Sequence, residues 1–268
     1  MLTRAALLTI LCLFVPALTS ASFAQQANQR PKLSDAEPGS VRVFVSGALR
    51  APLLNVKAQA EQAVGHSIFM EAGESRMLQS DIESGQPFEV ALITRPVIDE
   101  MVRKGRILPG SDLDVGVVRV GVAVKGDIPA DTDISTPSGL KKAMEGAASV
   151  RRFYGVGASV PTLDNLFTKL QIGNSLDGKI VALGVGRPAP EPDLKPGEYE
   201  MMINLASEVI PMKGWKYLGL IPEQFQMPVV MSAGIGSSGD ANTARALLSF
   251  LKSEQFGQAL KANGMSRR

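Results

Sequence analysis

Cysteine and histidine are nearly absent from this chain: among 268 residues there is one Cys and one His. Zinc sites and iron–sulfur clusters need several such ligands, so both are excluded, and so is a disulfide within the chain. A histidine can act as general base for a nucleophilic serine, but the chain has no GxSxG nucleophile elbow to supply that serine. We therefore interpret the single histidine, His66, as a loop residue. We expect neither a metal nor a cofactor.

A strong charge of one sign is also missing. Lys and Arg number 28 and Asp and Glu number 26, which gives a net charge of +2. Because these charges are scattered, the chain lacks the basic surface that nucleic acid or anionic membrane attracts, and we predict no such partner. Hydrophobic residues make up 45% of the sequence, which is enough for a packed core.

The first residues have the features of a secretory signal peptide. Arg4 precedes the apolar stretch Ala5–Leu18, and the small residues Ser22 and Ala24 stand before a cleavage point at Gln25. The apolar stretch is shorter than the ~20 residues that span a bilayer. We therefore predict a signal peptide at 1–24, a flexible lead-in at 25–39, and a periplasmic protein.

From residue 40 onward, apolar runs alternate with amphipathic segments, which is typical of an α/β fold with mostly parallel strands. The expected strands are 41–45, 66–70, 88–94, 115–124, 149–154, 180–183, 201–205 and 227–233. The expected helices are 52–64, 75–83, 96–104, 137–144, 161–170, 242–251 and 254–262. The segment 188–196 holds four prolines and is predicted not to be helical.

Polar loops follow several of these strands and precede helices. In a parallel sheet such loops meet at one edge, where helix N-termini present free N–H groups and a partial positive charge. This pattern predicts an anion site, although serine is also a common helix cap. The candidate residues are Ser46, Gly47, Ala48, Ser75, Arg76 and Arg95 in the first half, and Tyr154, Ser159 and Asn204 in the second.

One glycine motif suggests a different ligand. Gly234, Gly236 and Gly239 match the GxGxxG pattern of dinucleotide sites. Only helical segments follow the motif, without the βαβ unit that a dinucleotide site requires. We interpret it as a strand-to-helix loop.

Several motifs in order resemble the molybdate-type periplasmic substrate-binding proteins of ABC importers. The stretches are VFVSGAL, EAGESRMLQSDIESGQPFEVALITRPVIDEMVRKGRI and, at the end, SFLKSEQFGQALKANGM. The positions that match the family pattern are Ile82, Gly85, Pro87, Val90, Ile98, Asp99, Met101 and Gly105. Gly197-Glu198 and Ser207-Glu208 are similar to a later family segment, in which a tyrosine of the family falls at Leu205.

The resemblance implies a type II periplasmic binding fold, with two α/β lobes, each a mostly parallel sheet flanked by helices, and a ligand cleft between them. The implied boundaries are 40–118 and 228–268 for the first lobe and 119–227 for the second. Ser46 and Ser75 match the family's first-lobe serines, and Ser159 matches the second lobe's helix-start contact. The simplest assembly is a monomer.

The leading functional hypothesis from this resemblance is capture of a small anion, either a molybdate-like oxyanion or a small carboxylate, for delivery to an ABC permease in the inner membrane. The alternative is a periplasmic isomerase of a small tricarboxylate such as aconitate. For that reaction the candidate bases are Glu74 and Tyr154, and Arg95 is a candidate carboxylate anchor.

Overall fold

The computed structural model describes residues 31–183, 191 and 193–268. The predicted signal peptide, residues 25–30 of the lead-in and residues 184–190 lie outside this range. Within it, no helix has the length and apolar character needed to cross a membrane.

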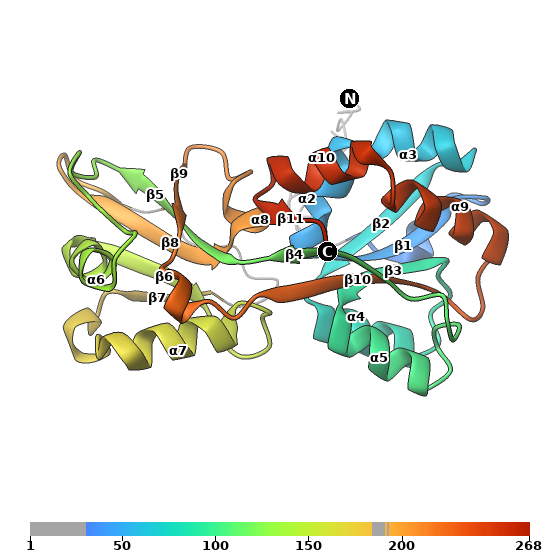
Figure 1. Ribbon diagram of the computed structural model, residues 1–268, viewed down its shortest axis with the longest axis horizontal. Helices are drawn as coiled ribbons and strands as arrows, with labels where there is room; N and C mark the ends of the chain where they lie inside the picture. The colour runs from blue at the N-terminus through green and yellow to red at the C-terminus, as the bar shows by residue number, and fades with distance from the viewer. Residues whose placement is uncertain (1–30, 184–190, 192) are drawn as a thin grey trace, which may run out of the picture. The chain divides into compact units, whose positions relative to one another are not determined.

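The first of two sheets has six strands (Figure 1). Their spatial order is β11 (Met265–Ser266), β4 (Leu113–Val118), β10 (Val229–Ile235), β3 (Val90–Thr94), β1 (Val41–Ser46) and β2 (Ile68–Gly73). Strand β1 lies parallel to β2 and β3, whereas β10 runs antiparallel to β3 and β4. The carboxyl ends of β1, β2 and β3 therefore meet at one edge of the sheet.

The second sheet has five strands. Their spatial order is β7 (Ile180–Leu183), β6 (Ser149–Phe153), β8 (Tyr199–Leu205), β5 (Val120–Gly126) and β9 (Lys216–Leu220). Strand β6 is parallel to β7 and β8, and β5 is antiparallel to β8 and β9. The carboxyl ends of β6 and β8 consequently share one edge.

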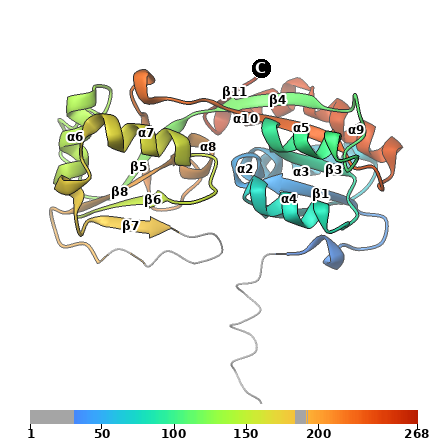
Figure 2. The ribbon, with the colours of Figure 1, turned by 90° about the horizontal axis from the view of Figure 1, so that it is seen from below.

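Alternating apolar side chains bury both faces of the first sheet under helices (Figures 1 and 2). Val43 and Val45 of β1 belong to the core on one face and Phe44 to the core on the other. The first face is covered by α2 (Gly47–Asn55), α3 (Lys57–Val64), α9 (Ala241–Leu251) and α10 (Glu254–Ala262). The second is covered by α4 (Ser75–Glu83) and α5 (Arg95–Arg103). We call this sheet with its helices the first lobe.

The second sheet is built in the same way. On one face, Val122 and Met201 join a core with Leu140 of α6 (Pro137–Gly146) and Leu163 of α7 (Val160–Leu170). On the other, Met202 packs with Val209 of the short helix α8 (Ala206–Val209). We call this sheet with its helices the second lobe. Outside the helices and strands, the described chain has three short 3-10 turns: η1 (Leu33–Asp35), η2 (Asn174–Leu176) and η3 (Glu223–Phe225).

The predicted two-lobe α/β class is confirmed, and two predicted elements are corrected. The expected strand 115–124 is two strands, β4 and β5, which break at Arg119 and join different sheets. The expected helix 52–64 is two helices, α2 and α3, which meet at Val56, where the backbone leaves helical geometry (φ −123°, ψ 19°). Neither break is marked by glycine or proline, so periodicity did not show it. Strand β9 and helix α8 were not predicted.

Candidate functional site

Three helices of the first lobe begin where parallel strands end. Ser46 closes β1 and precedes α2, Glu74 follows β2 and precedes α4, and Thr94 closes β3 and precedes α5. None of the three side chains caps the helix that it precedes. The first N–H groups of these helices are therefore left for water or a ligand.

The second lobe offers a matching edge. Ser159 precedes α7 without capping it, and α8 follows the last residue of β8, Leu205. Asn204 is buried in β8 and its side-chain amide donates to Oε2 of Glu208 on α8.

Serine hydroxyls at these helix starts are buried and available. Ser46 and Ser159 are 3% and 2% exposed, and neither hydroxyl has a hydrogen-bond partner in the described part of the chain. Ser75 accepts a hydrogen bond from the backbone N–H of Thr94 (3.1 Å), which leaves its own O–H free to donate. Hydroxyl and amide donors without a cation suit a small anion.

Two glutamates join the two lobes at this edge. A β-carbon placed at Gly47 would lie 2.7 Å from Oε1 of Glu208, so the second lobe's carboxyl rests against the first residue of α2. In the reverse direction, Oε2 of Glu74 lies 3.9 Å from the position that a β-carbon at Gly157, just before α7, would take. The helix starts of the two lobes therefore face a common site.

This carboxyl pair is only partly exposed and electrostatically strained. Burial and the nearby charge of Glu74 raise the pKa of Glu208 to about 8, against the opposing hydrogen bond from Asn204. Burial also raises the pKa of Glu74, while the Ala158 N–H acts in the opposite direction. No ion pair of either carboxyl is found among the described residues. Both shifts favour the protonated form of these carboxyls over the pH range in which an ordinary glutamate is ionised.

A cavity of about 440 Å³ opens beside these groups. Ser75 and Ala158, which both neighbour Glu74, line it from the two lobes. Its remaining walls are mostly apolar and come from Arg76, Thr94, Arg95, Pro96, Val97, Val156, Pro161, Met227, Pro228, Val229 and Val230. Apolar walls beside a few convergent polar groups are typical of sites for small organic molecules.

The predicted site residues divide into two groups. Ser46, Gly47, Ser75, Ser159 and Asn204 lie at the two facing edges. Ala48 is buried in the first turn of α2, behind Gly47.

The other predicted residues are bound by neighbouring side chains. Arg95 is 2.7 Å from Asp99, 2.9 Å from Asp112 and 3.3 Å from Asp114, so its charge is already neutralised. Arg76 pairs with Glu100 at 3.0 Å, at the mouth of the cavity. Tyr154 is 45% exposed and lies under the guanidinium of Arg152, 4.1 Å from the ring centre.

Sequence reasoning did not include Glu208 and Ala158 among the site residues. Both follow strands of the second sheet at their carboxyl ends, which is the same signal that selected Ser46. Glu208 also stands in the Ser207-Glu208 segment that carries the resemblance given above.

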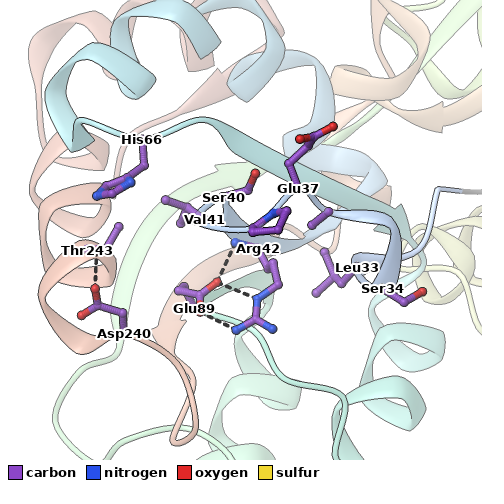
Figure 3. A pocket seen from close by; sticks show the side chains of 13 residues that line it. Leu33, Ser34, Glu37, Ser40, Val41, Arg42, His66, Glu89, Asp240 and Thr243 are labelled. Carbon is purple, nitrogen blue, oxygen red and sulfur yellow. Dashed lines mark hydrogen bonds and ion pairs between the residues drawn. The ribbon is translucent and has the colours of Figure 1, made fainter.

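The single histidine lies elsewhere. It lines a separate cavity of about 480 Å³ at the amino ends of β1 and β2, with the paired side chains of Arg42 and Glu89 and with Asp240, which accepts from Thr243 (Figure 3). Arg42, Glu89 and Asp240 are thus already paired. His66 is exposed and does not reach the edge that holds Ser46.

The glycine motif has a packing role. β-Carbons at Gly236 and Gly239 would lie 2.3 and 2.4 Å from the carbonyl oxygen of Phe88, so only glycine fits there. In the part of the chain that the structure describes, no group of three or more His, Cys, Asp or Glu side chains is placed to hold a metal ion.

A cleft between two α/β lobes, lined by open helix N-termini, defines a class of ligand-binding protein. Comparison with known proteins gives the family: the model for bacterial extracellular solute-binding proteins matches residues 41–266, and this chain belongs to that family. The resemblance predicted from the sequence is thereby confirmed.

The curated relatives include both an enzyme and a binding protein. The chain is 27% identical to aconitate isomerase of a Pseudomonas species over 245 residues, which are 88% of this chain and 90% of that protein. It is 25% identical over 247 residues to the molybdate-binding protein ModA of Azotobacter vinelandii, covering 85% and 90% of the two chains. The solved structure of the periplasmic molybdate-binding protein of Azotobacter vinelandii superposes with a TM-score of 0.67 at 16% identity, covering 85% of this chain and 100% of that one.

Proposed function

We propose that this protein binds a small organic carboxylate in the cleft between its lobes and delivers it to an ABC permease in the inner membrane. The observation that carries the proposal is the convergence of the uncapped starts of α4 and α5 in the first lobe and of α7 in the second on a cavity with apolar walls. The helix starts and serine hydroxyls suit carboxylate oxygens, and the apolar walls suit a carbon skeleton.

The carboxyl pair favours an organic acid over an inorganic oxyanion. Glu74 stands at the anion site without a cation, so a compact dianion such as molybdate would meet its negative charge there. A longer ligand can place its carboxylates at the helix starts and its carbon atoms beside the two glutamates.

Capture depends on differential affinity. Contacts from both lobes stabilise the closed arrangement only when the ligand bridges them. The periplasmic location, the predicted lobe boundaries and the monomeric state belong to this proposal.

Titration calorimetry and thermal shift with trans-aconitate, citrate, molybdate and sulfate test it. At 100 times its dissociation constant, a carboxylate should add about 2.7 kcal/mol to the free energy of unfolding. Ser75→Ala should weaken carboxylate binding about 10- to 100-fold, because a hydrogen bond to a charged group contributes about 1.5–3 kcal/mol. Ser138→Ala, in the exposed first turn of α6, is the matched control. Binding of molybdate alone, or equal loss in both variants, would contradict the proposal.

A second candidate function is isomerisation of a small tricarboxylate in the same cleft. The carboxyl pair favours it because proton transfer at carbon needs positioned acid and base groups. The similarity to aconitate isomerase supports it. A change in the ultraviolet absorbance of trans-aconitate on incubation with the protein would separate catalysis from binding alone.

A further inference from the structure

Each lobe places one carboxyl at a helix start of the other. A β-carbon at Gly157, just before α7, would lie 3.9 Å from Oε2 of Glu74 in the first lobe, and one at Gly47, at the start of α2, would lie 2.7 Å from Oε1 of Glu208 in the second. The two carboxyls are close enough for the charge of one to act on the other. Gly73, which precedes Glu74, pairs with Ser46, which precedes Gly47, so both carboxyls lie where β1 and β2 end.

This pair differs from the buried carboxylates that support the fold. Glu71 is 2.9 Å from the ammonium of Lys32, Glu89 is 2.7 Å from Arg42, and Glu200 is 2.7 Å from Arg151. Each structural glutamate has a cation, as buried charges require. Glu74 and Glu208 have no cation in the described ranges, so a structural ion pair does not explain why these two positions hold glutamate.

Two further groups at the same helix starts point to a ligand. The hydroxyls of Ser46 and Ser159 belong to residues that are more than nine-tenths buried, and neither has a partner among the described residues. A bound carboxylate at either helix start would supply the missing acceptor. Its carbon chain would then cross the region of the glutamates.

Resting on the proposed binding of a small carboxylate, we propose that Glu74 and Glu208 are the acid–base pair of an allylic proton shift in the bound ligand. The substrate class is an unsaturated di- or tricarboxylate with a methylene group next to its double bond. Glu74, ionised, takes a proton from the methylene carbon, and the electrons of that C–H bond form the new double bond. Glu208, protonated, gives its proton to the far carbon of the original double bond.

The step balances without any other reactant. One C–H bond breaks and one forms, the double bond moves by one position, and the proton that leaves Glu208 is replaced by the one that Glu74 has gained, through solvent. The negative charge that develops on the ligand carboxylates in the transition state lies at the helix N-termini, where it is stabilised.

The experiment follows trans-aconitate in deuterated buffer by proton NMR, with calorimetry on the same samples. Wild type should form cis-aconitate and incorporate deuterium at the methylene carbon. Glu74→Gln and Glu208→Gln should each convert at least about 100-fold more slowly, the usual contribution of a positioned acid or base, with less than about a 10-fold change in affinity. Glu223→Gln, an exposed glutamate of η3, should behave as wild type.

The outcomes separate the two proposals. Wild type that binds trans-aconitate but neither converts it nor incorporates deuterium overturns the proton-transfer role and leaves the binding function intact. Wild type that binds no carboxylate overturns both. If a Gln variant fails to bind, Glu208→Asp is the substitute, because it keeps the carboxyl group and shortens its reach. A wild-type conversion rate in Glu208→Asp or in either Gln variant contradicts the assignment.

Discussion

The two ends of the second sheet carry similar groups in opposite states. At the outer end, Glu200 in β8 pairs with Arg151, and Thr136 caps α6 by accepting from the Gly139 N–H. At the cleft end, Glu208 has no cation, and Ser159 leaves α7 uncapped.

The difference shows where the protein's polar groups bond to one another and where they remain free to bond to a ligand. Caps and ion pairs contribute to folding stability, so a region without them gives up free energy that a ligand can restore. Five substitutions, taken from the largest expected effect to the smallest, would break or sharpen this comparison.

The largest expected effect is at the outer end. Arg151→Met leaves Glu200 buried without its cation, and we expect it to lower the free energy of unfolding by about 3–5 kcal/mol. The double variant Arg151→Met with Glu200→Leu should recover most of the loss, because no uncompensated charge remains. Urea denaturation of both variants measures the change in the free energy of unfolding. An Arg151→Met variant as stable as wild type would contradict the contrast between the two ends of the sheet.

The next effect is a pH dependence at the cleft end. The pKa of Glu208 rises from 4.5 in its ordinary state to about 8 in the folded protein. Between these values the folded state holds a proton that the unfolded state has lost, so stability should fall as pH rises from about 5 to 8, by up to about 3 kcal/mol. Denaturation at several pH values measures the slope.

Glu208→Gln should remove most of that slope. The elements packed against α8 carry few other titratable groups that could account for it: Arg50 on α2, Lys125 on β5, Tyr199 and Glu200 on β8, and Lys216 and Tyr217 on β9. None forms an ion pair with Glu208 in the described chain, and only Glu74 acts on its charge. A slope of the opposite sign in wild type would show that the pair is ionised.

The smallest effects come from the two helix starts. Thr136→Ala should lower the free energy of unfolding by about 1 kcal/mol, because a cap is lost, and should leave carboxylate affinity unchanged. Ser159→Ala should do the reverse, with little change in stability and roughly 10-fold weaker binding. Thermal denaturation and calorimetry on the same pair test this crossed pattern, and parallel effects in both variants would remove the distinction.

Much of the site was predictable because it follows a local rule. Ser46, Ser75 and Ser159 each stand between an apolar strand and an amphipathic helix, and the edge of a parallel sheet brings such positions together. The availability of their hydroxyls was not predictable, since a serine at a helix start is as often a cap. The neutralisation of Arg95 was not predictable for a related reason: Asp112 and Asp114, which pair with it, follow in a separate segment of the chain.

By itself, the sequence determined most of the strands and helices, the α/β class and the serine-bearing helix starts, because apolar periodicity and chain direction act over a few residues. Only the tertiary structure decided that Glu208 of one lobe would rest at the helix start of the other, opposite Glu74. That meeting depends on how two separately formed lobes pack. Burial raises the pKa of both carboxyls, and the charge of Glu74 raises that of Glu208 further, and these effects exist only once the lobes are together.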